Sequence, residues 1–147
     1  MPLDTPPTDD LIREVLTRAR RIAVVGFSAN PGRPSHGVAR FLATRGYEVI
    51  PVNPGLAGQD FLGRKVAGSL ADIREGVDVV DVFRRSEEVA GVVEEVLAMA
   101  PRPFAIWTQI GVRDDAAAER ARAAGLLVIQ GRCPLIEMPR LGIWGPA

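Results

Sequence analysis

The sequence predicts an α/β protein with a doubly wound parallel sheet of about five strands and helices on both faces. Short apolar runs of strand length alternate with segments of helical period along the chain. The runs are continuously apolar, which is typical of strands buried on both faces. With 147 residues and 47% hydrophobic content, the chain is long enough for one such domain with its own core.

The chain is expected to begin with a short arm and a packing helix. Residues 1–7 are rich in proline and acidic, so they are interpreted as a flexible arm before a single domain over residues 8–147. Thr8 would cap the free N–H groups of a first helical turn. The apolar residues that follow recur at helical spacing: Leu11, Ile12, Val15, Leu16 and Ala19.

The remaining elements alternate between strand and helix. Strands are expected at 22–26, 47–52, 77–83, 104–108 and 126–130. Helices are expected between them at 36–45, with Ser35 as its cap, and at 86–100 and 114–124. Residues 55–76 are interpreted as a loop with room for a short helix at 69–74. The tail from Cys133 contains three prolines, and no helix or strand is predicted there.

This alternation predicts a Rossmann-like topology. Right-handed crossovers with a reversal after the first strand would place the five strands in the order 3-2-1-4-5. In such sheets, ligands bind beyond the carboxyl ends of the strands, where the strand order reverses. Five loops are therefore candidates for a site: 26–35, 53–58, 83–86, 108–114 and 131–134.

Composition excludes several classes of function. The 18 basic and 18 acidic residues cancel, which argues against nucleic acid as the main partner. All but Lys65 of the basic residues are arginines, whose planar fork suits phosphate and carboxylate groups. The sequence also lacks a membrane-spanning run, a disulfide pair and a metal-binding Cys/His pattern. A cytoplasmic protein is the expectation.

The loop after the first strand is the most informative candidate. Gly26 allows a tight turn, and the helix start near Ser35 would be an anion-binding end. Ser28, Asn30 and Arg33 add side-chain donors. The loop is longer than the usual dinucleotide turn and matches neither G-x-G-x-x-G nor the P-loop pattern. A plain connection between strand and helix is the alternative interpretation.

The end of the second strand tests for a dinucleotide. NAD binding expects an acidic residue there for the ribose hydroxyls. The sequence instead continues Val52-Asn53-Pro54-Gly55, and the nearest downstream base is Arg64. An adenine nucleotide with another phosphate arrangement fits these residues better than NAD or NADP.

Several segments together carry a resemblance. They are Val24–Ser28, Val49–Pro54, Gly63–Val66, Val79–Arg85 and Arg132–Pro134. In this order and at these spacings, the chain resembles the small stand-alone CoA-binding proteins over roughly residues 8–142. It is also similar to the CoA-binding N-terminal domain of the succinyl-CoA synthetase alpha subunit. The resemblance implies a Rossmann-like fold with coenzyme A held at the switch point of the sheet.

The resemblance also implies roles for particular residues. The group expected near the CoA phosphates is Gly26, Phe27 and Ser28. The group expected to border the adenine and its ribose is Val52, Asn53 and Pro54. The loops expected beside the rest of the cofactor contain Phe83, Arg84, Thr108 and Gln109. Gly55 stands where the synthetases commonly have a lysine, so Arg33 is the candidate for the 3′-phosphate contact.

The leading hypothesis is a module that binds CoA or an acyl-CoA without catalysis, as a carrier, a sensor or part of an assembly. The alternative is an NAD(P)-type oxidoreductase or an acyl-CoA-processing enzyme that uses Cys133 or His36. The ordinary interpretation of Cys133 is a small buried apolar residue, and that of His36 is a packed or capping histidine. The carboxylate of Asp81 is expected to have ordinary hydrogen-bond partners nearby, with Arg84 or Arg85 as one option. A homo-oligomer or an unidentified protein partner is left open.

Overall fold

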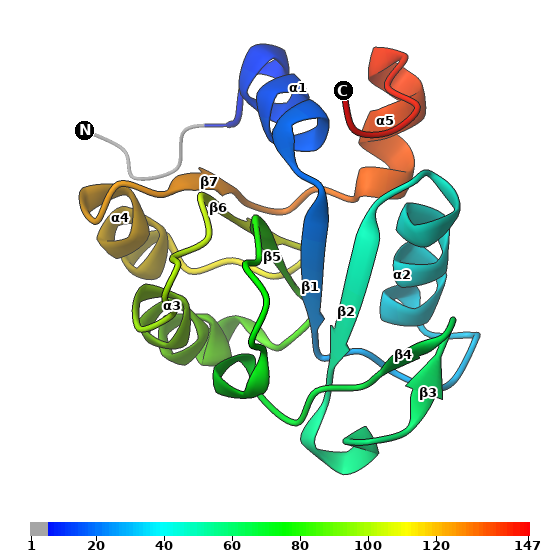
Figure 1. The fold of residues 1–147 in the computed structure, drawn as a ribbon. Helices are drawn as coiled ribbons and strands as arrows, with labels where there is room; N and C mark the ends of the chain where they lie inside the picture. Colours follow the sequence, from blue (N-terminus) through cyan, green and yellow to red (C-terminus); the bar gives the residue numbers. More distant parts are fainter. Residues whose placement is uncertain (1–5) are drawn as a thin grey trace.

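The fold is organised around a parallel sheet, as the alternating runs predict. In the computed structural model, residues 6–147 are described (Figure 1). The sheet strands are β1 (Arg21–Val25), β2 (Glu48–Val52), β5 (Val79–Val82), β6 (Ala105–Thr108) and β7 (Leu127–Ile129). The α-helices are α1 (Asp9–Arg18), α2 (Pro34–Thr44), α3 (Val89–Leu97), α4 (Asp115–Ala123) and α5 (Pro134–Leu141). Residues 1–5 of the expected arm lie outside the described part.

Helices cover both faces of the sheet, which confirms the predicted α/β class. Figure 1 shows α3 and α4 on one side, and α1, α2 and α5 on the other. Each layer has its own apolar core, because successive strand residues point to opposite faces. On β1, for example, Val24 packs under α1, α2 and α5, while Ala23 and Val25 pack under α3 and α4.

The predicted strand order 3-2-1-4-5 is wrong. The observed order is β2-β1-β5-β6-β7, so the third expected strand pairs with β1 instead of β2. Pro51 gives a physical reason. Its carbonyl points to the outer side of β2, where it accepts the N–H of Ala67 at 2.9 Å. The missing N–H of Pro51 faces the same side, so a full neighbouring strand would lose a hydrogen bond there. β2 is therefore an edge strand.

The segment between β2 and β5, expected to be a loop with room for a short helix, contains a hairpin. Its strands are β3 (Asp60–Phe61) and β4 (Arg64–Lys65), flanked by 3-10 turns η1 (Pro54–Leu56) and η2 (Leu70–Asp72). A third 3-10 turn, η3 (Ser86–Glu88), leads into α3. Two-residue strands are too short to show a period in the sequence. The chain around Ala67 covers part of the free edge of β2 through a bridge to Val52.

The proline-containing tail forms a helix, α5, to which the sequence analysis assigned no element. Pro134 occupies its first position, where no N–H is needed. Met138 and Ile143 are buried in the core shared with α1 and α2, and Gly142 ends the helix in the left-handed conformation (φ 68°). Burial of this apolar face outweighs the break in hydrogen bonding at Pro139.

Two further details concern the ends of the helices. Thr8 caps α1 as expected, since its hydroxyl accepts the N–H of Leu11 at 3.1 Å. Ser35 does not cap α2: the helix starts at Pro34, two residues before the expected start, with Arg33 as the N-cap residue. Within residues 6–147, no helix is long and apolar enough to cross a bilayer.

Candidate functional site at the carboxyl ends of the strands

The observed strand order places the switch point between β1 and β5. At their carboxyl ends lies a cavity of about 210 Å³. This is smaller than a typical pocket for a whole cofactor, so it would hold only part of a ligand such as CoA. It is lined by Gly26, Ser28, Arg33, Pro34, Ser35, Phe83, Gln109 and Val112. Six of these belong to the expected site. Pro34 and Val112 were not named, although both lie in candidate loops.

The N-terminus of α2 makes this cavity electropositive. Helix dipoles give the first turn a partial positive charge, and the first turn of α2 contains no acidic residue to offset it. Arg33 adds a full charge at the N-cap position, and no carboxylate within residues 6–147 pairs with it. Arg33 is exposed, so its guanidinium is available to a ligand anion.

Most backbone N–H groups of the loop after β1 are already used within the protein. Gly26 and Phe27 both donate to the carbonyl of Val52, at 3.1 and 3.2 Å. Phe27 is also buried, with 2% of its surface exposed. The expected approach of phosphates to these two residues is therefore not available through their N–H groups, because those groups hold the loop to β2.

Side chains within the same loop satisfy the next N–H groups. The N–H of Ser28 donates to the hydroxyl of Ser35 at 2.9 Å, and the N–H of Asn30 donates to the hydroxyl of Ser28 at 3.1 Å. The amide oxygen of Asn30 accepts the N–H of Gly32. Each serine hydroxyl thus accepts one bond and keeps its own proton to donate. These two protons, the Ser35 N–H and the guanidinium of Arg33 are among the donors left for an anion.

Gly26 is required where two loops of the cavity touch. Its φ is +86°, and a Cβ atom at this position would lie 2.6 Å from the carbonyl oxygen of Phe83. Only glycine permits this approach between the loops after β1 and β5. Gly26 and Phe83 both line the cavity, so the contact sets one side of its shape.

The residues expected at the adenine lie outside the cavity. Asn53 donates through its amide nitrogen to the carbonyl of Phe27 at 2.7 Å and accepts the N–H of Gly55 at 2.8 Å. Both ends of its side chain are therefore engaged: the nitrogen joins the loops after β1 and β2, and the oxygen caps η1. Val52 is buried at the end of β2, whereas Pro54 is exposed at the start of η1.

Two polar residues near the cavity are held by internal partners. Arg84 forms an ion pair with Glu88, which raises the pKa of the guanidinium, and a phosphate would have to compete with that carboxylate. Thr108 is buried; its hydroxyl donates to the carbonyl of Val112 at 2.7 Å and accepts the N–H of Gly131. The structure therefore gives Thr108 a role in connecting the loops after β6 and β7.

Gln109 differs from these residues because its amide oxygen has no partner. The oxygen is buried, and no donor within residues 6–147 reaches it. Gln109 lines the cavity. An acceptor in this position would be satisfied by an N–H group of a ligand.

The two candidate nucleophiles of the alternative hypothesis are packed inside the protein. Cys133 is 7% exposed in the core beneath α1, α2 and α5, and it does not line the cavity. His36 is also 7% exposed. Its Nδ1 lies 2.9 Å from the carbonyl oxygen of Ser28, and its Nε2 lies 3.2 Å from Nη2 of Arg40. The ordinary interpretations of both residues fit these surroundings.

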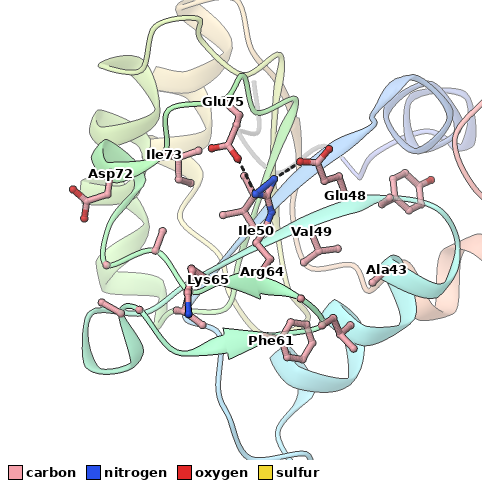
Figure 2. A pocket seen from close by; sticks show the side chains of 18 residues that line it. Ala43, Glu48, Val49, Ile50, Phe61, Arg64, Lys65, Asp72, Ile73 and Glu75 are labelled. Atoms are coloured by element: carbon pink, nitrogen blue, oxygen red, sulfur yellow. Dashed lines mark hydrogen bonds and ion pairs between the residues drawn. The ribbon is translucent and has the colours of Figure 1, made fainter.

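A larger cavity lies at the free edge of β2, away from the switch point. It measures about 940 Å³ and is bounded by the β3–β4 hairpin. Figure 2 shows Arg64 between two carboxylates. One is Glu75, whose Oε2 lies 2.7 Å from Nη1 of Arg64, and the other is Glu48. Since Arg64 is already neutralised, this cavity is a poorer site for phosphate than the one beside Arg33.

The sheet, its switch point and the electropositive cavity define the class of the protein. It is an α/β domain of the nucleotide-binding type. A family model described as a CoA binding domain matches residues 20–139. The chain belongs to this family, as the resemblance in its sequence indicates.

Individual proteins are similar over nearly the whole chain. YneT from Bacillus subtilis (strain 168), described as uncharacterized, is 42% identical over 127 residues, covering 86% of this chain and 91% of YneT. The structure of cell-free ID.343 from Thermus thermophilus is similar with a TM-score of 0.85 and 38% identity, covering 92% of this chain and 99% of that one. A hypothetical protein from Pyrococcus horikoshii OT3 also matches with a TM-score of 0.85, at 35% identity, covering 96% and 99%.

Proposed function

We propose that the protein binds coenzyme A or an acyl-CoA at the cavity between β1 and β5, and that it does so without catalysis of its own. Membership of the CoA-binding family supports the choice of ligand. The observation that carries the proposal is the set of free donors at the start of α2. Arg33 lacks an ion pair within the described residues, and Ser28 and Ser35 each keep a hydroxyl proton to donate.

The ligand would lie with a phosphate group at this helix end. The positive end of α2 and the guanidinium of Arg33 attract the same anion, and charge-assisted hydrogen bonds are the stronger kind. The cavity holds only part of the cofactor, so the remainder would extend over the neighbouring loops. The unpaired oxygen of Gln109 would accept an N–H group there, and the pantetheine arm of CoA carries two such amides.

A non-catalytic role is supported by the surroundings of the chemically reactive side chains. Cys133 is buried in the core, and both ring nitrogens of His36 have partners. A carrier, a sensor or a component of an assembly would each need a bound cofactor but no reactive group from this chain.

Isothermal titration tests the ligand directly. CoA and acetyl-CoA are expected to bind in a one-to-one ratio and more tightly than NAD or NADP, because Asn53 offers no carboxylate to the ribose of a dinucleotide. Tighter binding of NAD than of CoA would overturn the proposal and favour the oxidoreductase alternative.

The role of Arg33 is tested by comparing CoA with dephospho-CoA. Arg33→Ala is expected to weaken CoA binding about tenfold, the size of one lost charge-assisted bond. If Arg33 contacts the 3′-phosphate, dephospho-CoA should lose much less affinity. Arg74→Ala is the matched control, since Arg74 is also exposed but lies between η2 and β5. Equal losses for both ligands would remove the 3′-phosphate assignment and leave Arg33 as a contact to the diphosphate.

A further inference from the structure

Three aromatic side chains join the β3–β4 hairpin to the loop that lines the cavity. Phe27 from that loop, His36 from α2 and Phe61 from β3 are 2%, 7% and 8% exposed. The ring of His36 stacks on Phe27, with centroids 5.5 Å apart. Phe61 meets both rings edge-on, at 4.6 Å from Phe27 and 5.2 Å from His36. The hairpin therefore packs directly against the loop.

The hydrogen bonds of His36 define the state of its ring. Arg40 approaches Nε2 at 3.2 Å, and a guanidinium can only donate, so Nε2 must be the acceptor. Nδ1 then carries the proton and donates to the carbonyl of Ser28 at 2.9 Å. These two contacts correspond to the ring tautomer with its proton on Nδ1. The guanidinium of Arg40 also lies 5.6 Å from the ring centroid of Phe61, which links the hairpin to the same histidine.

Three hydrogen bonds hold Ser28 in place. His36 binds its carbonyl, Ser35 accepts its N–H, and Asn30 donates to its hydroxyl. The bond from His36 matters for an anion site, because a carbonyl oxygen left free beside a phosphate would repel it. With the carbonyl engaged by the buried ring, the hydroxyl proton of Ser28 remains as the group that Ser28 offers to the cavity.

Besides these ring contacts, the hairpin segment is attached to β2 through the hydrogen bonds of Ala67 and through the ion pair of Arg64 with Glu48. Beside it lies the open cavity of about 940 Å³, in which Arg64 pairs with Glu48 and Glu75 (Figure 2). Phe61 both lines that cavity and contacts His36. A displacement of the hairpin would thus move the ring that holds Ser28.

We infer that His36 is a positioning residue that transmits the position of the β3–β4 hairpin to the anion site. The inference rests on the proposed function for its effect on ligand affinity, but its structural part concerns the free protein. Phe61 orients the ring, Arg40 fixes its tautomer, and the Nδ1–H bond orients Ser28. A change at the hairpin therefore alters affinity for a phosphate-bearing ligand without touching it.

A double-mutant cycle tests the transmission, with CoA as the ligand and urea denaturation to confirm folding. His36→Phe keeps the stacked ring but removes both hydrogen bonds, and Phe61→Leu keeps an apolar hairpin contact. Each is expected to weaken CoA binding about fivefold to tenfold. The double variant should lose little more than either single one, since both act through the same bond to Ser28. Additive losses, or full affinity of His36→Phe, would overturn the inference.

The control in the same hairpin is Leu62→Ala, because Leu62 is 52% exposed and should leave CoA affinity unchanged. A second readout needs no ligand. The chain contains a single histidine, so ¹⁵N NMR reports His36 without ambiguity. The wild type should show the Nδ1–H tautomer, and Arg40→Met and Phe61→Leu should disturb it. An Nε2–H tautomer in the wild type would overturn the inference even if CoA binds. If the Nδ1–H tautomer is found but CoA does not bind, only the proposed function is contradicted.

Discussion

Gly26→Ala is expected to destabilise the protein by about 3 kcal/mol and to weaken CoA binding. The left-handed backbone at φ +86° disfavours any Cβ, and the added atom would lie 2.6 Å and 2.9 Å from the carbonyl oxygen and carbon of Phe83. Because those atoms belong to the backbone, the two loops would have to separate. Urea denaturation measures the stability, and titration with CoA measures the effect on the cavity.

Gly125→Ala is the matched control for this prediction. Gly125 has a similar φ of +95°, but a Cβ there would meet no atom within 4 Å. It should therefore cost only the backbone strain, about 1–2 kcal/mol, and leave CoA affinity unchanged. Equal destabilisation by the two substitutions would show that the loops after β1 and β5 separate freely, and that their close contact contributes no stability.

The second large effect is expected at Asp81, in the middle of β5. Its side chain is 1% exposed, and both carboxyl oxygens lack a partner within residues 6–147. A void of about 10 Å³ beside it is otherwise lined by apolar groups, including Val79 and Trp107. Burial raises the pKa of Asp81 well above its usual range, because the buried site disfavours the charged carboxylate.

This burial predicts a pH dependence of stability with a definite sign. Above the ordinary pKa of 3.8, the unfolded chain releases the proton of Asp81 while the folded protein retains it. Stability therefore falls as pH rises from about 4 toward the folded-state pKa, with a slope of about 1.4 kcal/mol per pH unit. Urea denaturation between pH 4 and 8 measures this slope. Asp81→Asn should lack this contribution.

Asp81→Val provides the complementary result at neutral pH. Valine suits a buried strand and needs no partner, so this variant should be more stable than the wild type by about 1–3 kcal/mol. If Asp81→Val were instead less stable and the wild type showed no slope, the carboxyl group would have to be satisfied in solution by a partner such as a bound water.

The expected partners of Asp81 illustrate what sequence patterns leave out. Arg84 follows Asp81 closely, but it lies in the bend after β5, whereas Asp81 is buried within the strand. Arg84 instead extends from the end of β5 and pairs with Glu88, one helical turn further on. Asp81 is therefore without the local partner that proximity in the sequence suggested.

The sequence contains one residue that indicates the position of β2 in the sheet. Pro51 lies within β2, and a proline without its N–H marks an edge strand. This observation would have excluded the order 3-2-1-4-5, in which β2 has neighbours on both sides. By contrast, the β3–β4 hairpin could not have been found from its period, because each strand has only two residues.

The sequence predicted which loops line the candidate site better than it predicted which hydrogen-bonding groups are free there. The switch-point rule selected the loops that contain Gly26, Arg33 and Gln109, and all three line the cavity. The rule could not show that the side chains of Asn53 and Thr108 already donate hydrogen bonds to backbone carbonyls of the protein. Both are polar residues at strand ends, and their pattern is the same whether they bind a ligand or a neighbouring loop.

The alternation of strands and helices, the α/β class and the resemblance to CoA-binding proteins can be read from the sequence alone, because they depend on local period and on the order of motifs. Tertiary structure decided the strand order, the helix α5 and the availability of each donor. A hydrogen-bonding group can bind a ligand only if no other part of the chain uses it. That condition depends on contacts between distant residues, as for Ser28 with His36 and Asn53 with Phe27.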